Sequence, residues 1–150
     1  MRRFALVLIL LFAAVLPARA QQSTDREQVR RAALDYVEGF YEGDSTKLVR
    51  SVSPNVRKNG YARGPNEAAY RASAMPYEGF MRYAAGVRAG RGGPPPNAPR
   101  DIVIYDVQDQ TASVKVTAWW GTDYLLLGKE NGRWMITHVL WQSSPRTEVR

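Results

Sequence analysis

Residues 123–141 read DYLLLGKENGRWMITHVLW, two largely apolar runs that flank Asn131-Gly132. Asn-Gly between such runs is a strong β-hairpin signal, because both residues accept the positive φ that a type I′ turn requires. A run of this length bounded by turn residues is typical of a strand. We therefore predict a hairpin whose strands cover residues 122–129 and 133–141.

Two further β-rich runs precede this hairpin, at residues 102–107 and 111–119. Asp109-Gln110 and Trp120-Gly121 are weaker turn signals that join the runs into a four-stranded antiparallel meander. The assignment of the second turn, Trp120-Gly121, has two alternatives. A bulky residue at the positive φ of a primed turn is strained, and the alternative is that Gly121 marks a β-bulge.

Directly opposite residues of antiparallel strands share a face of the sheet, and side chains alternate between faces along each strand. Pairing outward from two-residue turns defines one continuous face, which we predict to be the core. Asp123 and His138 are its ionisable interior residues and lie diagonally across neighbouring strands. A one-residue slip would move them to the other face. The full set is Val103, Tyr105, Val107, Ala112, Val114, Val116, Ala118, Asp123, Leu125, Leu127, Trp134, Ile136, His138 and Leu140.

The opposite face of the predicted sheet is mixed, but it holds too many large apolar groups to be fully solvated. A contiguous apolar patch on a surface indicates contact with a partner. We predict a homodimer through this face, with contacts from Trp119, Tyr124, Leu126, Val139 and Trp141.

Three helices are predicted upstream of the meander. Residues 28–42 carry an apolar stripe at helical period, and Gly43 suits the position that follows a helix end. Asp44 suits the N-cap of a short second helix, which Pro54 ends. A third helix begins near Pro76, a favourable first helical position.

Two segments before the meander lack periodicity. Residues 55–74 are expected to be irregular. Residues 89–100, AGRGGPPPNAPR, form a Gly/Pro-rich loop that reads either as a surface linker or as a mobile lid beside a pocket. Residues 143–150 are predicted to form a flexible tail.

Three blocks of the chain, residues 34–44, 101–116 and 123–141, resemble the nuclear-transport-factor-2-like (NTF2-like) superfamily and in particular its putative lumazine-binding branch, with a SnoaL-like fold. The resemblance implies an α+β cone over residues 21–142, with N-terminal helices packed on a curved antiparallel sheet of four or more strands. One departure is Val52-Ser53-Pro54, where this branch often has Leu-His-Pro. Chemistry that depends on that histidine is therefore not expected.

The same resemblance implies a conical cavity between the sheet and the helices. Superfamily members include dehydratases, isomerases, epoxide hydrolases and binding modules, so the fold does not choose an activity. We expect a pocket lined by Tyr36, Phe40, Phe80, Tyr105, Leu125, Trp134 and Ile136.

Three functions stay open at this point. The first is a module that binds a small apolar or aromatic ligand. The second is a cofactor-independent dehydratase or isomerase in which Asp123 and His138 transfer protons. The third is a non-catalytic dimeric interaction module. The sequence has no metal-ligand spacing and no phosphate-binding loop, so neither a metal nor a cofactor is expected.

Residues 1–20 read MRRFALVLILLFAAVLPARA, a charged start, a short apolar run and a small-residue cleavage site. This is the pattern of a secretory signal peptide. We expect cleavage near Ala20 and a periplasmic or secreted domain; an uncleaved anchor is the alternative, and Arg2-Arg3 leaves the export route open. The chain has no cysteine and a net charge of +7. Its basic residues are scattered among acids, which is not the pattern of a nucleic-acid binder.

Overall fold

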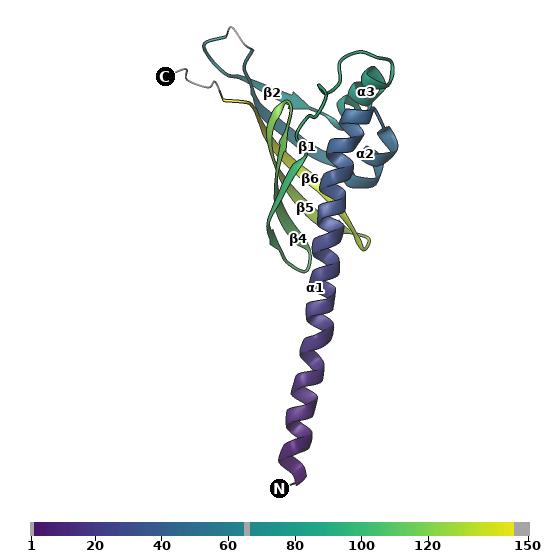
Figure 1. The fold of residues 1–150 in the computed structure, drawn as a ribbon, viewed down its shortest axis with the longest axis vertical. Helices are drawn as coiled ribbons and strands as arrows, with labels where there is room; N and C mark the ends of the chain where they lie inside the picture. The colour runs from purple at the N-terminus through teal and green to yellow at the C-terminus, as the bar shows by residue number, and fades with distance from the viewer. Residues whose placement is uncertain (1, 65–66, 146–150) are drawn as a thin grey trace.

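The structure, a computed structural model, describes residues 2–64 and 67–145, with side chains from Gln21 onward. Three helices pack on one side of a curved six-stranded sheet (Figure 1). This arrangement confirms the predicted α+β cone. The elements follow in the order α1 (Arg2–Glu42), α2 (Ser45–Ser51), β1 (Val52–Ala62), β2 (Arg71–Met75), α3 (Tyr77–Arg88), β3 (Asp101–Val107), β4 (Thr111–Ala118), β5 (Gly121–Glu130) and β6 (Arg133–Ser143).

The strand order in the sheet is β2-β1-β6-β5-β4-β3, and β1 runs parallel to β6 while every other pair is antiparallel. The predicted meander therefore forms β3 to β6. The prediction that residues 55–74 are irregular was wrong, because β1 and β2 occupy much of this segment. β1 contains Pro54, Asn59 and Gly60, which disfavour strands. Its pairing with β6 and β2 overrides that local preference.

Three predicted helix boundaries are confirmed: the end of α1 and the starts of α2 and α3. Two others were wrong, because α1 begins before residue 28 and α2 ends at Ser51, with Pro54 inside β1. α1 ends at Glu42, and Gly43 follows with a φ of 66°. The Asp44 side chain accepts a hydrogen bond from the backbone N–H of Thr46 at 2.9 Å and so caps α2. α3 begins directly after Pro76.

The turn between β4 and β5 is one residue earlier than predicted. It consists of Trp119-Trp120, and Gly121 opens β5 at a φ of 136° opposite Ala118. Moving a two-residue turn by one position changes each pairing by two residues, which keeps every side chain on its predicted face. Asp123 is therefore buried, as predicted, although it pairs with Val116.

A bulge in β6 overturns the second half of its predicted register. Leu127 pairs with Ile136 as predicted, but Leu126 pairs with His138, so Thr137 is an extra residue. One extra residue reverses the alternation of side chains beyond it. As a result His138 and Leu140 are exposed, whereas Val139 is buried.

A second bulge has the same effect in β3. Val107 pairs with Ala112 as predicted, but the register shifts between Ile104 and Asp106. Val103 and Tyr105 are therefore exposed instead of buried. Ile102 and Ile104 take their places against the core.

A charge cluster joins α1 to α2. The carboxylate of Asp35 is 2% exposed, and it accepts hydrogen bonds from Arg50 Nε at 2.6 Å and Arg31 Nε at 2.9 Å. Burial alone would raise the pKa of Asp35. The hydrogen bonds from Arg50 and Arg31 outweigh burial and hold this pKa below its ordinary value.

This cluster predicts acid sensitivity. A carboxylate whose pKa is lower in the folded chain stabilises the fold above its ordinary pKa, about 3.9. That stability is lost as the pH falls through the folded-state pKa. We expect Asp35→Asn to lower the melting temperature at neutral pH and to flatten its decline below about pH 4. Circular dichroism melts across pH test this, and an unchanged acid decline would contradict it.

Part of the chain lies outside the described side chains. The predicted signal peptide falls there, as do residues 146–150 of the predicted tail, while β6 extends to Ser143. Within the part of the chain whose side chains the structure describes, no helix has the length and apolar character of a membrane span. The Gly/Pro-rich loop is held at one end, because Tyr41 Oη donates to the Pro99 carbonyl at 2.5 Å.

Candidate functional site

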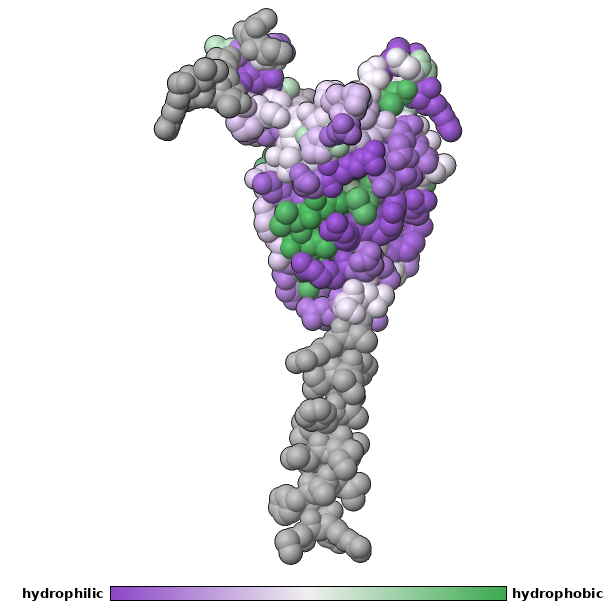
Figure 2. All heavy atoms as spheres, viewed as in Figure 1, coloured by the Kyte–Doolittle hydropathy of each residue, from purple (hydrophilic) through white to green (hydrophobic). Residues whose placement is uncertain are grey.

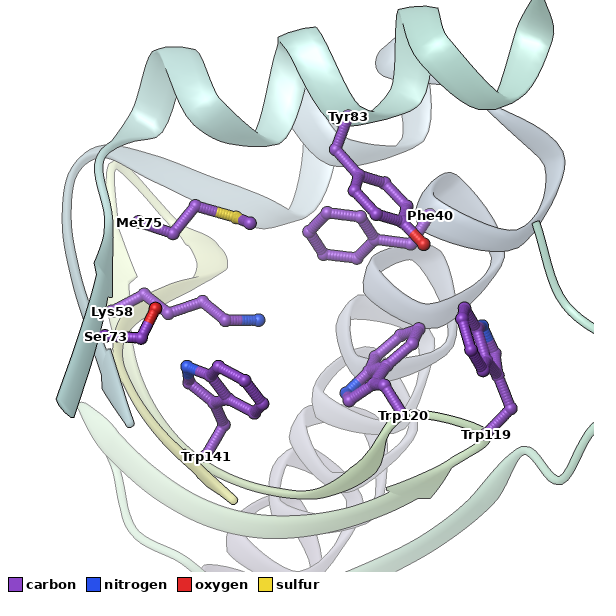
Figure 3. Close-up of a pocket in the computed structure, with 8 residues that line it drawn as sticks. All are labelled: Phe40, Lys58, Ser73, Met75, Tyr83, Trp119, Trp120 and Trp141. Atoms are coloured by element: carbon purple, nitrogen blue, oxygen red, sulfur yellow. The ribbon is translucent and has the colours of Figure 1, made fainter. Parts of the chain in front are cut away.

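A cavity of about 200 Å³ opens at the wide end of the cone, between the helices, the β1–β2 edge and the β4–β5 turn. Its walls are predominantly aromatic, and Figure 3 shows the side chains grouped around a central space. They come from α1, α3, β1, β2, β6 and the turn. The lining residues are Phe40, Lys58, Ser73, Met75, Tyr83, Trp119, Trp120 and Trp141.

Lys58 is the one charged residue among these lining residues. The alternation of β1 turns Val56, Lys58 and Gly60 inward, and Lys58 is 7% exposed. Its ammonium group projects toward the cavity centre (Figure 3). Five aromatic rings have their centroids 5.2 to 5.8 Å from Nζ, near enough for cation–π attraction.

Behind the cavity, Lys58 belongs to a hydrogen-bonded chain that we call the Lys58–Tyr36–Asp123 cluster. Lys58 Nζ donates to Tyr36 Oη at 2.6 Å, and Tyr36 Oη donates to Asp123 Oδ2 at 2.6 Å. The direct distance from Nζ to Oδ2 is 3.7 Å. Trp120 Nε1 donates to the other oxygen, Oδ1, at 3.1 Å. Both oxygens of the buried carboxylate are therefore paired.

Burial controls the electrostatics of this cluster. It lowers the pKa of Lys58, and the negative charge of Asp123 opposes this without cancelling it. It raises the pKa of Tyr36 well above the ordinary value, and Asp123 adds to that effect. Tyr36 therefore stays protonated and keeps its role as a donor to Asp123.

Trp141 reaches the cavity because Gly60 has no side chain. The two residues are directly paired between β1 and β6. A Cβ atom at position 60 would lie 2.2 Å from Trp141 Cδ1 and 2.3 Å from the Trp141 carbonyl oxygen. A glycine here permits the close approach of an indole to the backbone.

The structure separates the two predicted catalytic residues. Asp123 lies in the cluster with 0% exposure, whereas His138 is exposed beyond the β6 bulge. The ring of His138 contacts Thr137 Oγ1 at 3.1 Å. The predicted proximity of Asp123 to His138 was therefore wrong, and their proton-transfer partnership has no geometric support.

The predicted pocket residues divide into three groups. Phe40 lines the cavity. Tyr36 and Phe80 pack against the Phe40 ring, with their ring centroids 5.0 and 5.4 Å from its centroid. The remaining four lie elsewhere: Leu125 and Ile136 are in the deep core, Trp134 donates to Asp25 at 3.0 Å, and Tyr105 is exposed.

The predicted dimer face is also divided. Tyr124 and Leu126 are exposed, as that prediction requires, whereas Trp119 is exposed but also lines the cavity. Val139 is buried, and Trp141 lines the cavity, so neither is available on the outer face. The bulge at Thr137 causes both misplacements.

Sequence reasoning missed Lys58, Trp120 and Trp141 as site residues. Lys58 lay in the segment expected to be irregular, and Trp141 was assigned to the wrong face. The adjacent Trp119-Trp120 pair was a usable signal, because two tryptophans in a turn next to a predicted pocket favour an aromatic wall. Among the residues whose side chains the structure describes, no group of three or more His, Asp or Glu residues could hold a metal.

The fold agrees with comparisons to known proteins. The family described as putative lumazine-binding matches residues 24–142. No curated protein matches the chain. Solved structures with the same fold include NTF2-like proteins of unknown function from Shewanella baltica and Methylobacillus flagellatus. Each is 20% identical with a TM-score of 0.61; they cover 83% and 81% of this chain and 97% and 94% of their own.

A third similar structure is the association domain of C. elegans CaMKII, with 12% identity, a TM-score of 0.53 and coverage of 83% of this chain and 98% of its own. At such identities these similarities establish the fold alone. The chain belongs to the putative lumazine-binding family, and its fold is that of the NTF2-like proteins, as its sequence resemblance predicted.

Proposed function

We propose that this protein is an exported domain that binds a small, flat aromatic ligand with one hydrogen-bond acceptor. The observation that carries the proposal is the Lys58 ammonium, buried among five aromatic rings and directed into the cavity (Figure 3). Buried polar groups are stable when their donors are hydrogen-bonded. Tyr36 Oη accepts one N–H of the Lys58 ammonium, so an acceptor on a ligand in the cavity would pair a further one.

The size and walls of the cavity define the ligand further. About 200 Å³ is below the range for drug-sized ligands, about 300–1,000 Å³. A cavity of about 150 Å³ accommodates benzene. One or two fused rings therefore suit the space, and the indoles of Trp120 and Trp141 offer faces and edges for ring contacts.

Lys58 also determines where the ligand's polar group would lie. An ammonium has three N–H donors, and the structure assigns one of them to Tyr36. Asp123 neutralises the ammonium charge at 3.7 Å, so the cluster carries no net charge. A neutral acceptor, such as a carbonyl oxygen or a ring nitrogen, completes the donor set without introducing a second buried anion.

Ligand binding is testable by intrinsic fluorescence, because three of the four tryptophans line the cavity. We expect a one- or two-ring carbonyl compound, such as benzamide, to quench the emission saturably. Lys58→Met keeps the length of the side chain and removes its donors, and should weaken binding about tenfold or more, as expected for a hydrogen bond to a charged group.

The matched control for this experiment is Lys115→Met. Lys115 lies on β4, where it pairs with Tyr124 of β5, and it does not line the cavity. It should leave quenching unchanged. Saturable quenching that is equal in the wild type and Lys58→Met would remove Lys58 from the proposed site. The absence of saturable quenching for any one- or two-ring carbonyl compound would contradict the proposed function.

The proposed function includes export and a homodimer. The leader pattern of residues 1–20 supports export. The dimer proposal rests on the outer face of the sheet, where Tyr124, Leu126 and Leu140 are 47%, 51% and 52% exposed. A different hydrophobic patch, ringed by hydrophilic side chains, lies beside α1 on the face shown in Figure 2, where β3 and β4 are in front.

Native mass spectrometry of the protein exported by its own host tests both parts. We expect a polypeptide that begins at Gln21, a dimer mass, and any co-purified ligand on the same spectrum. Leu126→Lys should shift the dimer to monomer, because it places a charge within the apolar face. A retained leader would contradict export, and a wild-type monomer at micromolar concentration would contradict the dimer.

A further inference from the structure

We propose that Lys58 is a carbonyl-capturing amine: it forms an imine with small aromatic aldehydes that enter the cavity, and the Lys58–Tyr36–Asp123 cluster moves the protons. This inference rests on the proposed function, because the aldehyde occupies the same aromatic cavity. It goes further by making the contact between protein and ligand covalent.

The geometry supplies a reactive nitrogen at a place that a carbonyl carbon can reach. Lys58 Nζ lies at the cavity wall with its stem buried in β1, so the position of the nitrogen is restricted. The other lysines of the sequence lie elsewhere. Lys47 pairs with Glu38 and Glu42, Lys129 pairs with Asp25, and neither they nor Lys115 line this cavity.

The cluster also offers a route to the neutral amine, the only form that attacks a carbonyl. Protons can shift along the chain from Lys58 to Tyr36 and from Tyr36 to Asp123, because the two hydrogen bonds, each 2.6 Å, run in one direction. This shift converts an ammonium and a carboxylate into an amine and a carboxylic acid. It separates no new charge, and it needs no exchange with solvent.

Burial favours that outcome. Two opposite charges in an apolar site lose their hydration, whereas a neutral amine and a neutral acid lose much less. The lowered pKa of Lys58 also favours the neutral amine. The ordinary cost of deprotonating a lysine near neutral pH is therefore reduced at this position.

Imine formation consumes the aldehyde and releases one water molecule. The Lys58 amine nitrogen forms a bond to the aldehyde carbon, and a nitrogen proton moves to the carbonyl oxygen, which gives a carbinolamine. The Asp123 proton returns through Tyr36 to the hydroxyl group, which leaves as water. The products are a protonated imine on Lys58, an Asp123 carboxylate beside it and one water molecule. The carboxylate then neutralises the positive charge of the imine.

The cavity selects the class of aldehyde. A planar aryl ring fits between Phe40, Trp120 and Trp141, with its formyl group toward Lys58. Aliphatic aldehydes lack ring contacts, and the apolar walls disfavour sugars, whose hydroxyl groups would be buried without partners. Small aryl aldehydes of one or two rings are therefore the expected class.

Reductive trapping tests the inference. The purified protein is incubated with benzaldehyde and sodium cyanoborohydride, and the modified residues are identified by peptide mass spectrometry. We expect one benzyl group on Lys58, formed about tenfold or more faster than on Lys115, because a positioned reactant reacts faster than a free one. The N-terminal amine is distinguished by its own peptide. Equal labelling of all lysines would overturn the inference.

Two variants separate reactivity from binding. Lys58→Arg keeps a cation but forms no stable imine, so it should lose the adduct. Tyr36→Phe interrupts the proton chain with a minimal change in shape, and should slow adduct formation about tenfold or more relative to wild type, within the range for proton-transfer catalysis. Benzamide, which has the ring and acceptor oxygen but no reactive aldehyde, reports binding separately in each variant.

The outcomes distinguish the two proposals. Saturable benzamide quenching without trapping at Lys58 overturns imine formation and leaves ligand binding intact. Neither quenching nor trapping overturns both. If Tyr36→Phe fails to fold, as judged by circular dichroism, Lys58→Arg and the ratio of Lys58 to Lys115 labelling in the wild type still decide the question.

Discussion

The Asp123→Leu variant should lose about 3–5 kcal/mol of unfolding free energy, the range for removing one partner of a buried ion pair. Asp123 is 0% exposed, and its carboxylate neutralises Lys58 at 3.7 Å while accepting bonds from Tyr36 and Trp120. Without it, a buried ammonium has no counter-charge and Tyr36 has no acceptor. Chemical denaturation followed by tryptophan fluorescence measures the loss.

A matched triple variant shows what the cluster contributes. Lys58→Met, Tyr36→Phe and Asp123→Leu together remove both charges and the hydroxyl while keeping similar volumes. Replacing a complete buried ion pair with apolar residues is often neutral or stabilising. We therefore expect the triple variant to recover most of the stability lost by Asp123→Leu, and to bind benzamide as weakly as Lys58→Met does. A triple variant as unstable as the single one would contradict this account of the cluster.

That comparison bears on why the chain contains the cluster. If apolar residues can fill the same space at no cost in stability, the fold does not require Lys58, Tyr36 and Asp123 to be polar. The remaining explanation is what the polar groups do toward the cavity, where the ammonium projects among aromatic rings. Stability and ligand binding should therefore respond oppositely in the triple variant.

The elements that could be predicted from the sequence are those with strong local signals. The Asn131-Gly132 turn fixes the pairing of Leu127 with Ile136, and Asp44 fixes the start of α2. The bulge at Thr137 has no comparable signal, because the residues on either side of it are compatible with a strand in either register. That one residue decides whether His138 or Trp141 faces the core.

The residues of the candidate site could be predicted only where they lie on elements with strong local sequence signals. Phe40 comes from the apolar stripe of α1. Asp123 was placed on the correct face although the turn before it was predicted one residue too late, because a pairing shifted by two residues leaves each side chain on the same face of the sheet. Lys58 could not be predicted, because the sequence of β1 does not favour a strand and the segment becomes one by pairing with β2 and β6. A lysine in a polar segment carries no local sign of burial. The central residue of the site is therefore determined by tertiary pairing.

Gly60→Ala should disturb both the fold and the site through one atom. The added Cβ would lie 2.2 Å from the Trp141 ring and 2.3 Å from the Trp141 carbonyl oxygen, distances that real Cβ atoms do not show. The ring can turn away, but the carbonyl belongs to the β1–β6 pairing and cannot. We expect a loss of about 1–3 kcal/mol from overpacking. Because Trp141 must leave its place in the cavity, benzamide quenching should also weaken severalfold.

Gly128→Ala is the matched control, a second strand glycine on β5. Its added Cβ would have Thr137 Cγ2 at 3.5 Å as its nearest contact, which is ordinary packing. Replacing a strand glycine without a clash removes freedom from the unfolded chain and stabilises by about 0.4–1 kcal/mol. The two alanines should therefore move the denaturation midpoint in opposite directions. Equal effects would show that Gly60 is not required for the approach of Trp141, and that Trp141 does not need this backbone gap to line the cavity.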